Sequence, residues 1–314
     1  MDDDERLSAK YPKLSPELYP CKDGSTVPLS DGRVLGYKEY VGKDTDTSSL
    51  PVITLFPGIP GTRLFSHPLI DAGNFSGYRF IVLERPGFGL STAKKGRNIR
   101  DWVNDVLEFM DYMKIDKMSV IGYSAGGPYA LAVAHAIPHR LNKVALISSI
   151  SPREAQNVYA GMPWLFKIAW FCTAYAPSIV KYFASRVNRD EMLYDPVRFH
   201  RADCDLSPKC DVDVLLNPDV EYMFCASTME IYSRSQMDTE SEEYALWGRD
   251  WGFELKEIKA EVSVWQGALD PGTTVPMAEY IAKKIDCPLI VKYGHGHMLY
   301  FSMFEQITRW LLVK

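Results

Sequence analysis

The sequence predicts an α/β protein with a mostly parallel, doubly wound sheet and an inserted helical cap. Short apolar runs rich in β-branched residues alternate with segments of helical periodicity, a pattern typical of parallel strand pairing. These runs are apolar at nearly every position, so we expect helices to cover both faces of the sheet. The alternation stops at about Ser151 and resumes at about Glu261, and this interruption predicts the cap.

The predicted strands follow one another along the chain with helical patterns between them. The first strand is expected at residues 33–41, and the second, at residues 51–56, ends at Pro57 and Gly58. The others are expected at residues 79–83, 117–122, 143–148, 261–265 and 288–292. Helices are expected at residues 99–113, 128–137, 277–285 and 298–312. Strands joined in this way imply right-handed crossovers.

The chain divides into three predicted parts. Residues 1–31 are rich in proline, aspartate and serine and are expected to form an extended N-terminal extension. Residues 32–151 and 255–314 form the predicted core of the fold. Residues 152–254 hold aromatic residues, methionines and charged helical stretches, and they form the predicted cap. The ends of the cap, near Ser151 and Asp250, would act as hinges.

Composition restricts the classes of function. The 314 residues are 46% hydrophobic and 24% charged, which suffices for a sizeable core without a metal or disulfides. The net charge of -5 and the absence of a basic cluster argue against nucleic-acid binding. The acidic N-terminus lacks the apolar stretch of a secretory signal, so we expect a cytoplasmic protein with six reduced cysteines.

Residues 163–187 form an unusually aromatic segment. Its longest uncharged run, Ile168 to Val180, is shorter than the roughly 20 apolar residues of a membrane-spanning helix and contains Pro177. We therefore expect a buried pair of cap helices or an apolar substrate tunnel. Contact with a membrane surface is an alternative that we do not expect.

No metal or cofactor is expected. His200, Cys204 and Cys210 lie close in the sequence, but their spacing fits no common zinc site. His135 and His139 are separated by Pro138, which ends a helix between them.

The clearest functional motif is Gly122-Tyr123-Ser124-Ala125-Gly126, which follows a predicted strand and precedes a predicted helix. A nucleophilic serine needs this context, because a sharp turn with small neighbours exposes its hydroxyl at the carboxyl edge of the sheet. The alternative is a tight loop with an unused serine.

A serine hydroxyl needs a base, and in this topology a histidine late in the chain should supply it. We favour His297, which is preceded by Gly296 and leads into the last helix, with His295 as the alternative. The base in turn needs an orienting acid. Asp270 follows the strand before the histidine strand, whereas Asp286 comes just before a strand, at the wrong edge of the sheet.

The developing oxyanion needs two backbone amides. One should come from Ala125, directly after the nucleophile. The other should come from the loop Phe56–Gly61, in which Ile59 is the candidate because Pro60 has no N–H. Gly58 and Gly61 would allow the backbone to approach a ligand closely.

Taken together, these motifs resemble the α/β-hydrolase fold superfamily, in particular serine hydrolases with a helical cap. The branch with an FHGTPGSR oxyanion loop is the most similar, and its motifs stand here as FPGIPGTR at 56–63, ERPGFGLS at 84–91, GYSAGGPYALA at 122–132, WGF at 251–253 and GHGH at 294–297. The resemblance implies a Ser124–His297–Asp270 triad. One departure is Pro57, where the family usually has a histidine that braces the loop.

The leading hypothesis is a serine hydrolase that cleaves a carboxylic ester or related acyl bond of a small, fairly apolar substrate. Carbon–carbon bond hydrolysis, lactone hydrolysis, proline-type aminopeptidase activity and acyl transfer use the same serine and stay open. Epoxide hydrolases and dehalogenases of this fold use an aspartate nucleophile, so the serine at position 124 argues against them. The alternative from another class is a small-ligand receptor of the same fold.

Overall fold

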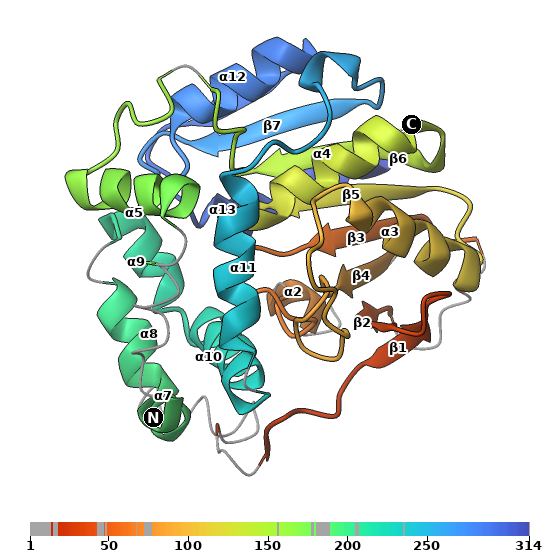
Figure 1. Ribbon diagram of the computed structural model, residues 1–314, viewed down its shortest axis with the longest axis horizontal. Coiled ribbons are helices and arrows are strands. Elements are labelled where there is room, and N and C mark those ends of the chain that lie inside the picture. The colour runs from red at the N-terminus through yellow and green to blue at the C-terminus, as the bar shows by residue number, and fades with distance from the viewer. Residues whose placement is uncertain are drawn as a thin grey trace.

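An eight-stranded sheet forms the centre of the computed structural model (Figure 1). The structure describes residues 14, 18–42, 47, 49–66, 68–71, 77–155, 157–176, 179, 189–204, 207–234 and 236–313. The strand order is β1-β2-β4-β3-β5-β6-β7-β8. The bounds are Ser25–Pro28 (β1), Val34–Tyr40 (β2), Val52–Phe56 (β3), Arg79–Leu83 (β4), Met118–Tyr123 (β5), Leu141–Ile147 (β6), Val262–Gly267 (β7) and Leu289–Lys292 (β8).

Strands β3 to β8 are parallel, while β1 and β2 are antiparallel to their neighbours. The predicted mostly parallel sheet is therefore confirmed. Every residue of β3, β5 and β7 is buried, as the apolar runs predicted. Because parallel strands end at the same edge, the loops after β3, β5, β7 and β8 meet there.

Strand β1 corrects the expectation that residues 1–31 are only an extended lead-in. Residues Ser25–Pro28 pair with β2, with Val27 opposite Leu35. Only Val27 of the four is buried. A strand at the edge of a sheet can leave most of its side chains in solvent, so its sequence did not show the apolar run that indicated the central strands.

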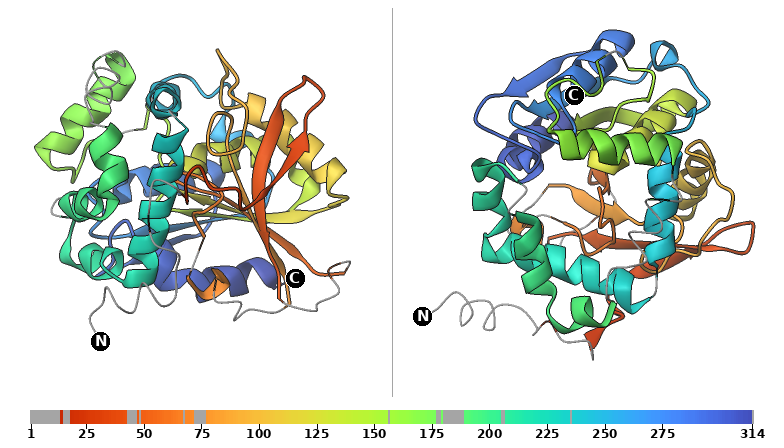
Figure 2. Two further views of the ribbon diagram at one scale, coloured as in Figure 1. Left: turned by 90° about the horizontal axis from the view of Figure 1, so that it is seen from below. Right: turned by 60° about the vertical axis from the view of Figure 1, so that its left-hand side comes forward.

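Helices cover both faces of the sheet (Figure 2). On one face lie α3 (Asp101–Tyr112), α4 (Gly127–Ala136) and α12 (Val275–Ile285). On the other lie α13 (Leu299–Leu312) and the short α2 (Pro68–Asp71). This arrangement is the doubly wound architecture that the sequence predicted.

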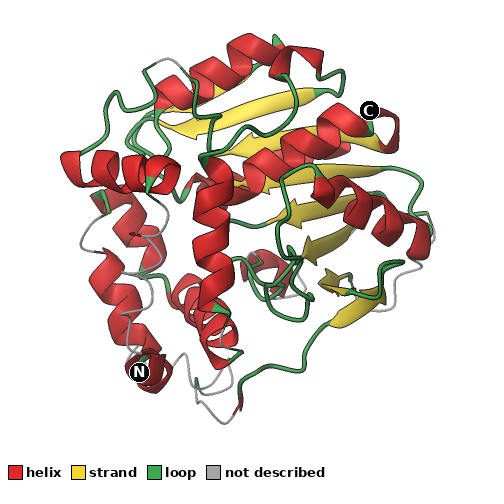
Figure 3. Ribbon diagram, viewed as in Figure 1, coloured by secondary structure: helices red, strands yellow, loops and turns green. Residues whose placement is uncertain are grey.

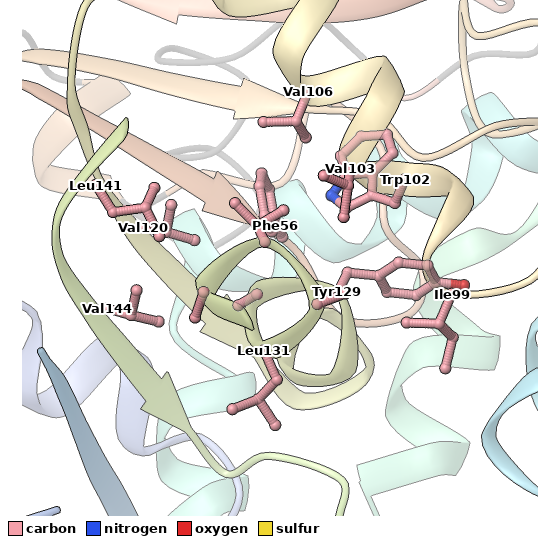
Figure 4. Close-up of a cluster of buried hydrophobic side chains, with 14 of the residues drawn as sticks. Phe56, Ile99, Trp102, Val103, Val106, Val120, Tyr129, Leu131, Leu141 and Val144 are labelled. Carbon is pink, nitrogen blue, oxygen red and sulfur yellow. The ribbon is translucent and has the colours of Figure 1, made fainter. Parts of the chain in front are cut away.

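Buried side chains between the sheet and helices α3 and α4 support the loop after β3 and the turn between β5 and α4 (Figure 4). Trp102 of α3 is 1% exposed, and its ring meets Phe56 edge-on with centroids 5.3 Å apart. Tyr129 of α4 lies on the same indole, at 6.2 Å. Burial of such a side chain contributes on the order of 1.5–3 kcal/mol. The end of β3 and the start of α4 are thus held by one rigid cluster.

The described residues between 152 and 254 form helices and no strand (Figure 3). These helices lie beyond the carboxyl ends of the parallel strands, where they face the loops that meet at that edge (Figure 1). They are α5 (Trp164–Tyr175), α7 (Arg189–Tyr194), α8 (Pro196–Cys204), α9 (Lys209–Leu215), α10 (Pro218–Ser233) and α11 (Met237–Trp247).

Helix α5 corrects the expectation of a buried helix pair in the aromatic segment. Trp164 is 72% exposed, and Ile168 and Phe171 are more than half exposed. The helix packs against the rest of the protein on one side, through Phe166 and Trp170, which are both partly buried. Residues 177, 178 and 180–187 of the segment lie outside the described residues. Among the described helices, none is both long and apolar enough to span a membrane.

Candidate active site

Ser124 lies on a strained turn between β5 and α4. Its φ of 52° is in the left-handed region, which residues with a side chain rarely adopt. The flanking glycines make the turn sterically feasible: a Cβ at Gly126 would lie 1.9 Å from the carbonyl oxygen of Phe56, and one at Gly122 would lie 2.6 Å from the Cβ of Ala130. The turn therefore requires glycine at both positions, as the motif indicated.

His297 follows β8 and reaches Ser124. Its Nε2 lies 3.0 Å from Ser124 Oγ, and its Nδ1 lies 2.7 Å from an oxygen of Asp270. About a quarter of the His297 side chain is exposed (25%), whereas the Asp270 side chain is completely buried. This geometry suits a neutral imidazole that donates from Nδ1 and accepts the serine proton at Nε2.

Asp270 lies in the turn after β7, which supplies donors to both of its oxygens. The amides of Gly272 and Thr273 each donate to Oδ1 at 2.9 Å, and the Thr273 hydroxyl donates to Oδ2 at 2.7 Å. Burial by itself would raise the pKa of Asp270, but the charge and hydrogen bond of His297, together with the two hydrogen bonds from Thr273, hold it below its ordinary value. The carboxylate is therefore ionised at neutral pH.

Asp270 also sets the basicity of His297. Burial would lower the pKa of the imidazole, but the charge and hydrogen bond of Asp270 outweigh burial and raise it above its ordinary value. Asp211 adds to the same effect.

The competing candidates lie elsewhere. The carbonyl of His295 accepts a hydrogen bond from the Leu269 amide, and His297, rather than His295, lies within hydrogen-bonding distance of Ser124. Asp286 caps the carboxyl end of α12, just before β8 and therefore at the opposite edge of the sheet.

Two of the histidines considered as metal ligands have hydrogen-bond partners in the protein. His135 bonds Glu257, and His200 bonds the carbonyl of Leu215. The described residues contain no group of three or more His, Cys, Asp or Glu side chains that could hold a metal ion. All six cysteines are free thiols.

The proposed oxyanion loop lies against the serine. A Cβ at Gly58 would be 3.1 Å from Ser124 Cβ and 3.5 Å from its Oγ, so the backbone passes directly beside the nucleophile. Ala125 follows Ser124 and is buried. The structure thus brings the loop of Ile59 and the amide of Ala125 to the serine, and their role as oxyanion donors stays a prediction.

Arg85 holds this loop through two hydrogen bonds to its backbone carbonyls. Its guanidinium is fully buried and donates to the carbonyls of Pro57 and Gly58, the latter at 3.2 Å. In a trans peptide the carbonyl and the following N–H point in opposite directions. Holding the Gly58 carbonyl on the Arg85 side therefore directs the Ile59 amide to the other side. Arg85 provides a support for the loop in which Pro57 replaces the family's usual histidine.

A buried carboxylate from the cap holds Arg85 in turn. Glu243 of α11 accepts from Arg85 Nε at 3.2 Å, from Arg97 and from the Tyr129 hydroxyl at 2.9 Å. Burial would raise the pKa of Glu243, but the two arginines lower it below its ordinary value. The ionised Glu243 thus links helix α11 to the loop at Pro57 and Gly58 through Arg85.

Sequence reasoning missed three of these groups. Arg85 belongs to the motif at residues 84–91, but nothing in that motif indicated its contact with the loop at Pro57. Glu243 and Asp211 belong to the cap, which matched no motif. Asp211 of α9 accepts hydrogen bonds from the backbone amides of His297 and Met298. No signal in the sequence separated these two acids from the other charged residues of the cap helices.

Comparisons with known proteins agree with the architecture. A family model described as alpha/beta hydrolase fold matches residues 51–177. One relative is the dihydrolipoyllysine-residue acetyltransferase component of the acetoin cleaving system of Pseudomonas putida. The two sequences are 32% identical over 173 residues, and the matched stretch covers 54% of this chain and 44% of that protein. It is 39% identical over 100 residues to a 2-hydroxy-6-oxo-6-phenylhexa-2,4-dienoate hydrolase of Burkholderia cepacia, covering 31% of this chain and 35% of the relative. The matched stretches thus span less than half the length of these curated relatives.

Solved structures extend the similarity to nearly the whole chain. A meta-cleavage product hydrolase from Pseudomonas fluorescens superimposes with a TM-score of 0.63 at 19% identity, covering 92% of this chain and 96% of the other. An enol-lactonase from Burkholderia xenovorans does so with a TM-score of 0.58 at 20% identity, covering 92% and 98%. At this level of identity the likeness concerns the fold.

Proposed function

Because this chain belongs to the α/β-hydrolase fold superfamily, we propose that it is a serine hydrolase that cleaves a carboxylic ester or related acyl bond. The observation that carries the proposal is the continuous hydrogen-bonded series from Ser124 through His297 to Asp270, with separations of 3.0 and 2.7 Å. Aromatic side chains support a small, fairly apolar substrate: Trp170 of α5 donates to the carbonyl of Gly272 beside Asp270, and Phe166 lies next to it.

The reaction would proceed in two steps. His297 takes the proton of Ser124 as the serine oxygen bonds to the acyl carbon, and the amides of Ile59 and Ala125 stabilise the resulting oxyanion. His297 then gives its proton to the leaving alcohol, and an acyl-enzyme remains. Water, deprotonated by His297, attacks the acyl carbon; the bond to the Ser124 oxygen breaks, the carboxylic acid leaves, and His297 returns the proton to Ser124. Asp270 keeps the imidazole oriented and stabilises its cation.

Carbon–carbon bond hydrolysis is the second candidate. The 39% identical relative is named as a 2-hydroxy-6-oxo-6-phenylhexa-2,4-dienoate hydrolase, and two further relatives are named as hydrolases of similar 2-hydroxy-6-oxo acids. Such a substrate also presents a carbonyl to the serine, so the same three residues would serve.

A panel of substrates tests the proposal. We expect p-nitrophenyl esters of graded acyl length to be hydrolysed, with the preferred length reporting the size of the pocket. A 2-hydroxy-6-oxo-dienoate in the same panel separates the second candidate, since cleavage of that compound alone would replace the ester assignment. A fluorophosphonate probe should label Ser124. A protein that neither labels nor turns over any substrate would be a binding protein of this fold.

The pH profile of ester hydrolysis should report His297. Only the neutral imidazole can accept the serine proton, so kcat/KM should fall as the pH drops through the pKa of His297. Because Asp270 raises that pKa, the acid limb should have its midpoint above the ordinary histidine value of about 6.5. Measurement of kcat/KM from pH 5 to 9 checks this, and an activity that is flat down to pH 5 would contradict it.

Arg85→Lys should impair catalysis more than it impairs binding. A lysine amine cannot hold both carbonyls of the loop in the way that the guanidinium does. We expect a kcat loss of about tenfold or more, up to the 10²–10³-fold associated with loss of an oxyanion donor. Steady-state kinetics on the best ester of the panel provides the measurement.

Arg97→Lys is the matched control. Arg97 shares Glu243 with Arg85, but within the described part of the chain its guanidinium donates to Glu243 and to the Tyr129 hydroxyl and not to the loop at Pro57. Weakening the ion pair alone should therefore leave kcat within about threefold. Equal losses in both variants would show that the buried ion pair, and not the support of the loop, is what matters.

A further inference from the structure

Asp211 is a buried carboxylate that the proposed reaction does not use. It lies on the cap helix α9, is 2% exposed, and contacts the segment that carries His297. Its Oδ2 accepts from the amide of His297 at 2.6 Å, and its Oδ1 accepts from the amide of Met298 at 3.0 Å. A residue of the cap thus binds the backbone of the proposed base directly.

The His297 segment is built to receive this carboxylate. Helix α13 begins at Leu299, and no side chain of its own caps its amino end. The amides at the start of a helix have no partner within the helix, and a negative charge there is favoured by the helix dipole. Position 296 is glycine, and a Cβ there would lie 2.2 Å from the Asp211 carboxylate. The carboxylate therefore occupies the space that a side chain at position 296 would need.

The imidazole of His297 has ionisable neighbours from three elements. Asp270 faces it from the turn after β7 and Asp211 from α9, while the ring of Tyr123 on β5 lies 5.5 Å away, between centroids. Burial raises the pKa of the Tyr123 phenol far above its ordinary value, so this group is neutral. Among the described residues, His297 therefore has one acidic neighbour at its imidazole, Asp270, and one at its backbone amide, Asp211.

Burial and hydrogen bonding act on the Asp211 carboxyl in opposite directions. The pKa of Asp211 is raised above its ordinary value, because burial outweighs the opposing effect of the amides of Met298 and His297 and of the nearby imidazole. On its own helix, burial keeps the Cys210 thiol neutral by raising its pKa, and Asp213 lies at the surface in a pair with Lys209. A charge as deeply buried as that of Asp211 is only weakly screened by solvent.

We propose that Asp211 is a positioning residue that ties the cap to the base: its two hydrogen bonds hold the backbone of His297 so that the imidazole faces Ser124. The inference rests on the proposed function, in which His297 is the base. It makes helix α9 a part of the catalytic architecture as well as a cover over it.

The inference requires two effects of Asp211 variants on ester hydrolysis. Asp211→Ala removes both hydrogen bonds, and a displacement of the base on the order of 1 Å would lower kcat by up to about 10²-fold. Asp211→Asn retains one acceptor but removes the charge, so the pKa of His297 falls and the acid limb of kcat/KM moves to lower pH. Looser folding of the cap would lower activity without moving this limb.

The experiment compares the purified wild type with Asp211→Asn, Asp211→Ala and the surface control Asp213→Asn on one p-nitrophenyl ester. Rates of fluorophosphonate labelling against pH provide a second readout, and thermal unfolding shows whether each variant is folded. We expect lower kcat and a shifted acid limb in Asp211→Asn, with Asp213→Asn unchanged in both. An acid limb at the wild-type position in Asp211→Asn overturns the inference, even if Asp211→Ala does not fold.

Failure of the proposed function would look different. If Ser124→Ala retained the turnover of the wild type, the serine mechanism itself would be wrong, and the inference with it. If Ser124→Ala were inactive while Asp211→Asn behaved as the wild type, only the role of Asp211 would be lost.

Discussion

Ser124→Ala should abolish ester hydrolysis, with a fall in kcat of about 10⁴- to 10⁶-fold. The side chain of alanine cannot form the acyl-enzyme, and His297 would then have only water to activate. Binding should change little, because the change removes one oxygen atom from a partly exposed side chain. The measurement is kcat and KM for the best ester of the panel, with fluorophosphonate labelling as an independent test of the same oxygen.

A control from the same strand excludes a general effect of removing a hydroxyl. Ser119 lies on β5, is buried, and donates to the carbonyl of Leu311 rather than to any group of the site. Ser119→Ala should keep kcat within a few-fold, at a modest loss of stability of about 1 kcal/mol for one buried hydrogen bond. Undiminished hydrolysis by pure Ser124→Ala protein would refute the serine mechanism.

His297→Gln should produce a loss of similar size, about 10⁴-fold or more in kcat. Glutamine can fill part of the same space, but its amide cannot take the proton of Ser124. The hydrogen bonds to Ser124 and Asp270, at 3.0 and 2.7 Å, are the contacts that the variant breaks. Steady-state kinetics on the same ester measures the loss.

His295→Gln is the matched variant, two residues away in the same loop. His295→Gln should change kcat by no more than about threefold, because the histidine that lies within hydrogen-bonding distance of Ser124 is His297. If the two losses were equal, or if His295→Gln were the more damaging change, the assignment of the base would be wrong. Because effects within one catalytic unit are not additive, His297→Gln combined with Ser124→Ala should be little worse than Ser124→Ala alone.

Local patterns in the sequence were sufficient for the central architecture. The apolar run of β5 and the glycines around Ser124 indicate a buried strand and a sharp turn without reference to distant residues. Chain order then selected Asp270, since parallel strands bring their carboxyl ends to one edge. Strand β1 escaped prediction because an edge strand needs few apolar residues. The exposure of α5 escaped it because apolar composition does not state what the helix packs against.

The sequence by itself determined the parallel strands of the sheet, the place of Ser124 and the order of the candidate residues, because these depend on short-range patterns and on strand direction. Tertiary structure decided between His297 and His295, because it is the imidazole of His297 that lies 3.0 Å from the Ser124 oxygen. It also supplied the support of the Pro57 loop by Arg85, which is 28 residues away from Pro57, and the contact of Asp211 with His297 across 86 residues. Such contacts join side chains to backbone groups of distant segments, so their partners become visible only in the folded structure.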